Sequence, residues 1–461
     1  MAFAESAPAG EFDCDVAVVG GGPVGLAAAI GARLRGFEVV VVEPRGAAVD
    51  KACGEGLMPG AVAELLRLGV RPHGHPLTGI TYKSAAHPTW RQAGHDFRAG
   101  PGVGMRRTEL STLLTERAAS CGVRFRLARV ESLVQDARGV TLSLASGNGD
   151  LPSTLRSEWV FGCDGLHSSI RGMLELDPPP APKRSRRRFG LRQHFAVTPW
   201  SDHVEVYWSP RFELYVTPVG ERMIGVALLG ERGLDLAAAI AATPELAARL
   251  DGADAMTPVR GAGPLRQRVA QHARGRVLLI GDASGYVDAL TGEGLRLGFA
   301  QATAAVAALA APIGLAAARV APATASDAPA TAPVAASVAP ATASDAPATA
   351  PVAARVASAI ASDAPATAPV AARDAPVAAL AASTGQVASV PAAARGPAAD
   401  LASAAEVVAR YERGWLTVSG GPTRFTAALY ALSRTPLRAA FVPAGSHVPA
   451  VFSAAVERLA E

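Results

Sequence analysis

The sequence has few cysteines and almost no excess of charge of either sign. Its four cysteines, among 461 residues, are scattered with no CxxC pair and no metal-ligand spacing: Cys14, Cys53, Cys121 and Cys163. This pattern argues against disulfides and against a zinc site, and it is typical of a reducing cytoplasm. Lys and Arg number 44 against 40 Asp and Glu, so the charge balance demands neither nucleic acid nor another polyanion as a partner.

Targeting signals and long hydrophobic runs are also scarce. Glu5 and Glu11 precede the first apolar run, whereas a secretory signal peptide has a basic start and a longer apolar core. One uncharged stretch, Leu297 to Ala318, reaches membrane-spanning length, but it is mostly alanine and contains Gln301 and Pro312. We therefore expect a cytoplasmic protein with no transmembrane segment, in which this stretch is a buried helix followed by a linker.

Residues 312–404 have a different composition from the rest of the chain. They are rich in Ala, Pro, Thr and Ser, and the run ASDAPATAPVAA starts at 325, 343 and 361, a period of 18. Such a segment cannot bury enough apolar surface to offset its ordering entropy, and it is too poor in large side chains to stack as a solenoid. We predict a disordered insert; a Pro-rich spacer or docking arm is the alternative.

The remaining sequence predicts an α/β fold with 49% hydrophobic residues from which to build its core. Residues 13–180 and 265–311 alternate between strand and helix patterns, which is typical of a Rossmann-type domain in two parts. Residues 181–264 carry mainly strands and predict an inserted, mostly antiparallel sheet. Its strands are expected at Phe189–Phe195, Val204–Trp208, Leu214–Pro218 and Met223–Leu229. Residues 405–461 show amphipathic spacing and predict C-terminal helices that pack back on the body.

A glycine-rich turn follows the first predicted strand, Cys14–Val19. In the run Gly20-Gly21-Gly22-Pro23-Val24-Gly25, the first glycine permits a tight turn and Gly22 lets the backbone approach a pyrophosphate. Gly25 lets the following helix pack closely on the strand, and the free amides at the start of that helix face the phosphates. Pro23 and Val24 belong to the same predicted site.

An acidic residue stands at the distance that a dinucleotide site requires. The second strand, Phe37–Val42, ends in Glu43, whose carboxylate can accept both hydrogen bonds of a ribose diol. We place Arg45 beside it. The strand, the turn, the helix and the acid together predict a dinucleotide site, but they do not distinguish NAD from FAD.

Two distant segments make that distinction by resemblance. Gly162–Arg171 resembles the DGxxSxxR motif of FAD-dependent hydroxylases, which implies that Asp164 and Gly165 lie beneath the pyrophosphate. The alternative is an ordinary strand-to-helix turn with the aspartate as a cap. Arg276–Gly285 resembles the GDA motif, in which the aspartate, here Asp282, binds a ribityl hydroxyl of FAD.

Two helix starts complete the predicted cofactor site. Gly292 and Gly294 open a helix whose amides would point at the flavin pyrimidine ring, where negative charge gathers on reduction. The segment Met105–Leu110 matches the RxxL pattern with which such flavoproteins place an arginine near the flavin or its phosphates. We assign Arg107 to this role in preference to Arg106; the alternative is a pair of surface charges.

With these motifs, the chain resembles the flavoprotein class that includes aromatic hydroxylases, geranylgeranyl reductases and flavin-dependent halogenases. The resemblance covers about 13–310 and the C-terminal helices, and it implies that the inserted sheet of 181–264 holds the substrate over the flavin. Asp50–Leu57 is similar to the Cys-Gly stretch of the reductases, and Gly285 and Tyr286 stand where hydroxylases more often have His and Pro. Ala289 replaces a usual proline. No Trp-x-Trp-x-x-Pro run occurs, so we set halogenation aside.

The resemblance implies two competing activities and leaves a third class open. We favour a monooxygenase in which NAD(P)H reduces FAD, O2 gives a C4a-hydroperoxyflavin, and oxygen passes to an aromatic or polyketide-type molecule of secondary metabolism. The alternative is a geranylgeranyl-reductase-like enzyme that delivers hydride to a carbon-carbon double bond. A non-enzymatic flavin-binding sensor or partner is the third hypothesis, although the strand-rich insertion argues against it.

Catalytic residues are not identifiable from the sequence, but four side chains are candidates for the pocket. His194 and Tyr215 could orient a phenol or be structural residues. Glu55 could be an acid or part of a simple turn, and Glu293 could face the active site or cap its helix. The basic run Lys183–Arg188 is either a solvated loop or a contact for an acidic carrier protein or an NADPH 2′-phosphate.

Overall fold

The computed structural model describes residues 12–310 and 403–460, apart from short gaps at 47–48, 86–91, 147–152, 178–186, 436–437 and 439–440. The insert predicted for 312–404 falls almost entirely outside the described residues and stays a prediction. No helix in the described part of the chain is long and apolar enough to cross a membrane. The four cysteines are free thiols.

The first sheet carries the strand ends that the motifs follow. Its strands are β1 (Cys14–Val19), β2 (Val39–Val42), β8 (Arg124–Arg126), β9 (Ala128–Gln135), β10 (Val140–Ser146), β11 (Ser153–Gly162), β18 (Ala273–Arg274) and β19 (Val277–Leu279). Their order is β18-β19-β11-β1-β2-β8, with β10 pairing β11 and β9. Because β19, β11, β1 and β2 are parallel neighbours, their carboxyl ends lie at one edge of the sheet.

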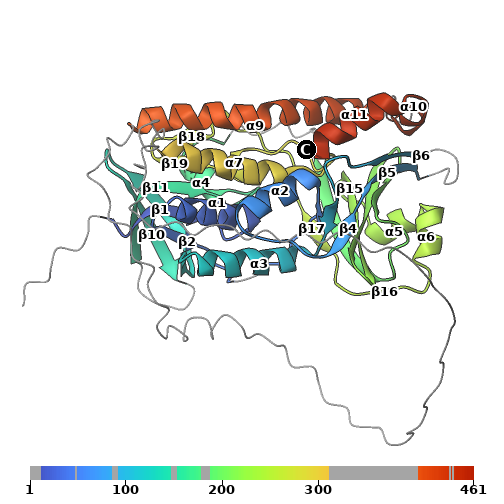
Figure 1. The fold of residues 1–461 in the computed structure, drawn as a ribbon, viewed down its shortest axis with the longest axis horizontal. Coiled ribbons are helices and arrows are strands. Elements are labelled where there is room, and N and C mark those ends of the chain that lie inside the picture. Colours follow the sequence, from blue (N-terminus) through green and yellow to red (C-terminus); the bar gives the residue numbers. More distant parts are fainter. Residues whose placement is uncertain are drawn as a thin grey trace, which may run out of the picture. The chain divides into compact units, whose positions relative to one another are not determined.

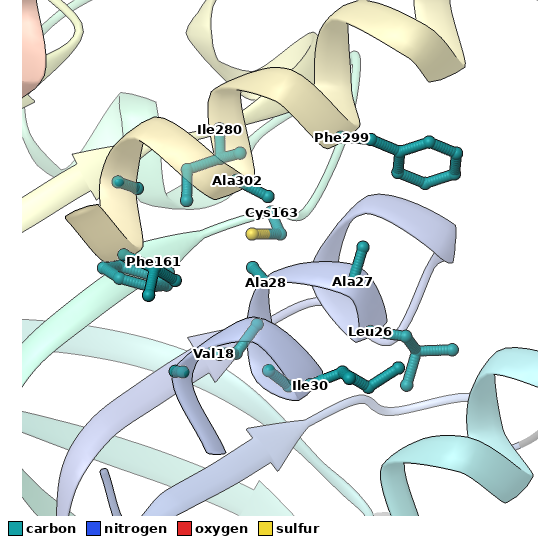
Figure 2. Packing of buried hydrophobic residues seen from close by; sticks show 14 of the residues in the cluster. Val18, Leu26, Ala27, Ala28, Ile30, Phe161, Cys163, Ile280, Phe299 and Ala302 are labelled. Carbon is teal, nitrogen blue, oxygen red and sulfur yellow. The ribbon is translucent and has the colours of Figure 1, made fainter. Parts of the chain in front are cut away.

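Helices cover this sheet because its central strands are apolar on both faces, as parallel strands usually are. All four valines of β2 are buried. The helices of this part are α1 (Pro23–Leu34), α2 (Pro59–Arg67), α3 (Arg107–Ser120), α4 (Ser169–Met173), the short 3-10 helix η1 (Gly281–Ser284) and α7 (Gly294–Leu309). Figure 2 shows Cys163, at the end of β11, between Ala28 of α1 and Ala302 of α7. Small side chains at these positions let the two helices approach each other.

The second sheet is the inserted one, and it is larger than the sequence predicts. Its strands are β5 (Gly79–Ser84), β6 (Gln92–Asp96), β12 (Arg188–Ala196), β13 (His203–Trp208), β14 (Phe212–Gly220), β15 (Met223–Glu231), β16 (Asp254–Ala255) and β17 (Arg260–Ala262). The order is β16-β12-β15-β14-β13-β5-β6, with β17 on β12. Only β13 and β5 pair in parallel among these strands. The helices α5 (Leu236–Ala241) and α6 (Pro244–Arg249) follow β15.

β5 and β6 belong to a different sheet from the one that the predicted domain ranges imply. Both strands lie within 13–180, the range predicted as the first part of the cofactor domain, yet β5 pairs with β13 of the second sheet. A strand pattern gives the faces of a strand but not the sheet that it joins, which explains the difference. A small third sheet, β3 (Gly56–Leu57), β7 (Gly102–Gly104) and β4 (His75–Leu77), lies in the same part of the chain.

Three C-terminal helices complete the described fold: α9 (Ala404–Leu432), α10 (Phe441–His447) and α11 (Pro449–Ala460). A capping box between Ser403 and Glu406 begins α9, which lies along α7 (Figure 1). The hydroxyl of Tyr411 donates to the carbonyl of Leu279, at 2.5 Å, and so ties α9 to β19. The predicted fold class is confirmed: a Rossmann-type α/β domain, an inserted mostly antiparallel sheet and C-terminal helices.

Gly25 offers a direct test of the packing of α1. A Cβ on Gly25 would lie 1.9 Å from the carbonyl oxygen of Gly20, whereas a Cβ on Gly31 would meet its nearest neighbour, Val306, at 3.6 Å. We expect Gly25→Ala to lower the free energy of unfolding by about 3 kcal/mol. Gly31→Ala, in the same helix, should raise it by roughly 0.5 kcal/mol. Urea unfolding measures both; equal stability of the two variants would contradict this packing.

Candidate functional site

The carboxyl ends of β1, β11 and β19 are in direct contact. Gly20, which follows β1, has a φ of 109° and would place a Cβ only 2.5 Å from the carbonyl oxygen of Cys163, which follows β11. Gly281 follows β19, and a Cβ there would lie 3.1 Å from the side chain of Val24 in α1. The three motifs found far apart in the sequence therefore meet at one place.

The turn after β1 presents backbone amides and an arginine to the same space. Gly22 is the N-cap of α1, no side chain caps the helix, and Pro23 is its first residue. The amides of Val24 and Gly25 in the first turn have no partner within the helix. A Cβ on Gly22 would lie 3.8 Å from Nη2 of Arg107, so the guanidinium lies across the turn. Amides at a helix start beside a guanidinium form a site for a phosphate.

Glu43 lies directly after β2 and is fixed beside this turn. Its carboxylate accepts hydrogen bonds from the amide of Gly21 at 2.9 Å and from Nε of Arg45 at 2.8 Å. Burial acts to raise the pKa of Glu43, but the hydrogen bonds from Arg45 and Gly21 prevail and hold that pKa below its usual value. An ionised carboxylate has further lone pairs, so Glu43 can also accept from a ribose diol.

Asp282, directly after β19, lies near two cations, Arg107 and Lys51. Burial raises the pKa of Asp282, and the nearby charges of Arg107 and Lys51 oppose that rise. Burial also lowers the pKa of Lys51, together with the positive charges of Arg45 and Arg107. Lys51 is a member of the site that the sequence motifs did not predict, and the one signal for it is its place two residues before Cys53 in the Cys-Gly segment.

Asp164 can serve in both of the roles considered from the sequence, as a helix cap and as a cofactor ligand. Its Oδ2 accepts from the amides of Ser169, at 2.7 Å, and Ile170, at 3.1 Å, so it caps the start of α4. Its Oδ1 is buried and has no hydrogen-bond partner in the described part of the chain. Gly165 has a φ of 85°, and a Cβ there would meet no atom within 4 Å. One oxygen of Asp164 and the open face of Gly165 are available to a ligand.

The first turns of α7 pack against the start of α1, because a Cβ on Gly298 would lie 2.4 Å from the side chain of Val24. The helix begins at Gly294, and Gly292 has a φ of 71° with open space where a Cβ would stand. Glu293 occupies the N-cap position, but its side chain does not cap the helix; it is buried and pairs with Arg296. Burial raises the pKa of Glu293, and Arg296 opposes the rise. Glu293 therefore neutralises a neighbouring cation on its own helix.

Glu55, in the loop before β3, and His194, in β12 of the second sheet, are in contact. The Glu55 carboxylate contacts Nε2 of His194 at 2.5 Å and accepts from the amide of Arg107 at 2.9 Å. The other ring nitrogen of His194 lies 3.1 Å from Oγ1 of Thr257 and 3.0 Å from Nη1 of Arg192. Because both nitrogens have partners within the protein, His194 fits the structural alternative better than a role in orienting a phenol.

Tyr215 is likewise engaged by the protein. Its hydroxyl donates to the carbonyl of Leu290 at 3.0 Å, which joins β14 to the loop before α7. Burial raises the pKa of Tyr215 far above its usual value. Its ring packs in an apolar cluster that also contains Tyr286 and Leu290. Tyr215 thus borders the site as a neutral aromatic side chain.

The prediction for the basic run Lys183–Arg188 is wrong at Arg188. Residues 183–186 lie outside the described residues, and Arg187 is exposed. Arg188, however, begins β12 with its side chain buried, where it pairs with Glu213 and lies 3.7 Å from Asp288. It therefore cannot belong to a surface patch for a carrier protein or a 2′-phosphate. The arginine is buried because two carboxylates, from elements that are distant in the sequence, face it.

Asp288 is a buried acid that the sequence analysis did not single out. Burial raises its pKa from 3.8 to about 6, the charge of Arg188 opposes that rise, and the charge of Glu213 adds to it. Its Oδ1 accepts from the amide of Leu290 at 3.1 Å, and its Oδ2 has no hydrogen-bond partner in the described part of the chain. No sequence motif marks it, because its burial depends on the second sheet.

The raised pKa of Asp288 makes a prediction about stability. A protonated Asp288 stabilises the fold, and this contribution is lost as the pH rises from about 4 to about 6, because the folded protein holds the proton to higher pH than the unfolded chain. Asp288→Asn should therefore raise the free energy of unfolding by about 2 kcal/mol at pH 8 and change it little at pH 4.5. The exposed Asp251→Asn is the control. Equal effects of Asp288→Asn at both pH values would refute the burial argument.

The site as a whole fits a long, anionic nucleotide. Buried polar atoms without partners in the described part of the chain include Oδ1 of Asp164 and Nε of both Arg106 and Arg107. The first can accept from a hydroxyl, and the guanidinium groups can bind a phosphate. Among the described residues, no group of His, Cys, Asp and Glu side chains is arranged to hold a metal ion.

Comparison with known proteins agrees with a site for a nucleotide cofactor. The family model described as FAD binding domain matches residues 13–330. A menaquinone reductase of Mycolicibacterium smegmatis is 30% identical over 317 residues, which are 62% of this chain and 73% of that protein. The 12-dehydrotetracycline 5-monooxygenase/anhydrotetracycline 6-monooxygenase of Streptomyces rimosus is 29% identical over 327 residues, 62% of this chain and 61% of that protein.

Solved structures share the fold at lower identity. A p-nitrophenol 4-monooxygenase from Pseudomonas putida superposes with a TM-score of 0.55 at 23% identity, covering 64% of this chain and 78% of that chain. A flavin-dependent halogenase superposes with a TM-score of 0.56 at 21% identity, covering 65% of this chain and 58% of that chain. At these identities the likeness concerns the fold alone. From the family match and the converging motifs, the chain belongs to the FAD binding domain family and is an FAD-dependent oxidoreductase.

Proposed function

We propose that the chain is an NAD(P)H-dependent monooxygenase that uses O2 to hydroxylate an aromatic or polyketide-type small molecule. The observation that carries the choice is the state of Glu55. A double-bond reductase needs an acid beside the flavin, and Glu55, the acid considered for that role from the sequence, has both carboxylate oxygens occupied, one by the amide of Arg107 and the other by His194. Hydroxylation by a flavin in a dry site needs little proton transfer from the protein.

Two partly buried aromatic side chains beside the start of α7 support an aromatic substrate. They are Tyr215 of β14 and Tyr286, and a Cβ on Gly294 would lie 3.4 Å from the ring of Tyr286. Aromatic side chains favour stacked and edge contacts with an aromatic ligand. The relative that is named an anhydrotetracycline monooxygenase agrees with a polycyclic substrate.

The residues of the site can be assigned to the parts of FAD. The pyrophosphate would lie on the turn from Gly20 to Gly25 and against Arg107, with Asp164 and Gly165 beneath it. Glu43, supported by Arg45, would accept from the adenosine ribose, and Asp282 would accept from the ribityl chain. When bound, FAD supplies the two-electron chemistry that links oxidation of NAD(P)H to activation of O2.

Other groups of the protein would set the conditions for that chemistry. The start of α7, from Gly292 to Gly294, would place its amides and its positive dipole end at the pyrimidine ring and stabilise negative charge there. The partly buried Tyr215 and the apolar side chains around it would exclude water. Exclusion of water strengthens each of these electrostatic contacts.

Arg107 gives a test of the cofactor site. Arg107→Ala removes a charged hydrogen-bond donor from the phosphate site, and we expect the dissociation constant for FAD to rise about 10- to 100-fold. Titration of the apoprotein with FAD, followed by flavin fluorescence, measures the constant. Arg67→Ala, at an exposed arginine of α2, is the matched control and should leave the constant unchanged. An unchanged constant for Arg107→Ala would remove Arg107 from the site.

The proposed reaction is tested with the purified, FAD-loaded protein. Phenols and polycyclic ketides should accelerate NAD(P)H oxidation, and a product made under ¹⁸O2 should contain one labelled oxygen atom. Oxidation of NAD(P)H without labelled product, for every compound in such a set, would contradict hydroxylation. No oxidation at all would instead favour the flavin-binding sensor or partner.

Double-bond reduction is a second candidate, because one observation favours it. The menaquinone reductase relative is matched over 73% of its length. In such an enzyme Asp288, with its pKa raised by burial to about 6, would be the acid that supplies the proton. Reduced protein that is reoxidised by an isoprenoid quinone side chain without O2, with loss of the double bond, would establish this activity in place of hydroxylation.

A further inference from the structure

Glu55 is a buried carboxylate that links three separate elements. It lies in the loop before β3, its Oε1 accepts from the amide of Arg107 at the start of α3, and its Oε2 contacts His194 of β12 at 2.5 Å. The side chains of Glu55 and His194 are 1% and 0% exposed, and Nη2 of Arg192 lies 3.8 Å from the carboxylate. The carboxylate thus connects the second sheet to the helix that carries Arg107.

The backbone at Glu55 indicates that its side chain is needed there. Its φ is 57°, in the left-handed region that side chains other than glycine seldom adopt. Such conformations persist where the surroundings fix the residue and its side chain has a function. Glycines flank the position at Gly54 and Gly56, so a glycine at 55 would relieve the backbone but lose the carboxylate.

The same strand of the second sheet also holds the other end of the loop. Arg192, fully buried in β12, donates to Asp50 and to the carbonyl of Lys51 at 3.1 Å. It also lies 3.0 Å from Nδ1 of His194. The loop from 50 to 55 is therefore held by β12 at both ends, and it carries Lys51, whose charge acts on Asp282.

We propose that Glu55, His194 and Arg192 form a clamp by which the second sheet positions Arg107 and the loop 50–55 for FAD. We call these three residues the Glu55 clamp. Glu55 and His194 are positioning residues in this proposal and take no part in the chemistry. The proposal rests on the FAD contact proposed for Arg107 and is independent of whether the enzyme hydroxylates or reduces its substrate.

A second buried pair in the same chain serves as an internal control. His95 of β6 contacts Glu457 of α11 at 2.5 Å, and Glu457 also accepts from the amide of Arg98 at 3.1 Å. This pair has the same chemistry and also joins two distant elements. Among the residues that the structure describes, none of its hydrogen bonds involves Arg107 or the loop 50–55, so its loss should affect stability without affecting the cofactor.

The first experiment compares FAD affinity with apoprotein stability in four variants. Glu55→Ala should raise the dissociation constant for FAD about tenfold and lower the urea midpoint of the apoprotein. Glu55→Gln keeps an oxygen for the Arg107 amide and should stay within about threefold of wild type. Glu55→Gly should recover the urea midpoint relative to Glu55→Ala but keep the weak affinity. Glu457→Ala should lower the midpoint and leave the affinity within about twofold.

The second experiment tests the link through the histidine. His194→Ala should also weaken FAD binding, although its ring contacts Glu55 and not the cofactor site, and the double variant with Glu55→Ala should be no weaker than the single variants. Full recovery of FAD affinity in Glu55→Gly, an equal loss in Glu457→Ala, or simple additivity in the double variant would each overturn the proposal. Because the measured quantity is FAD affinity, failure of the hydroxylation assay would leave these results unaffected.

Discussion

The whole arrangement depends on how closely α1 packs against the ends of β1 and β11. Only glycine permits this distance, since a Cβ on Gly25 would lie 1.9 Å from the carbonyl oxygen of Gly20. The close packing aims the start of α1 at the edge where β1, β11 and β19 end. It also lets the side chain of Val24 contact Gly281 after β19. The packing thereby brings together the start of α1, Asp164 and Asp282, which come from segments far apart in the chain.

The second sheet meets the loops of this edge through buried charges as well as through apolar contacts. Arg192 holds Asp50, and Arg188 faces Asp288. Removing such charges from water is costly, and buried pairs often contribute little net stability compared with apolar residues of the same size. Their directional contacts fix one position of the loops beside the proposed flavin site. Such fixed loops suit an enzyme that must hold its reacting atoms in a defined geometry.

The sequence predicts the cofactor domain well because its signals are local. The run of apolar residues in β1 has the same bounds in the sequence analysis and in the structure, Cys14–Val19, and Glu43 directly follows β2. The sequence does not predict which residues or strands pair when they are far apart in the chain. Nothing near Glu55 in the sequence indicates that its partner is His194, and nothing in β5 indicates that it joins β13. Arg188 was mistaken for part of a surface run because the two carboxylates that bury it come from distant elements.

The central claim is that three strand ends hold one FAD molecule. A crystal structure of the protein with FAD tests it most directly. The account predicts the pyrophosphate over the turn at Gly22, with Arg107 against it, and the ribityl chain at Asp282. FAD bound elsewhere, or a protein that binds no FAD while these three strand ends keep the geometry described, would contradict the account.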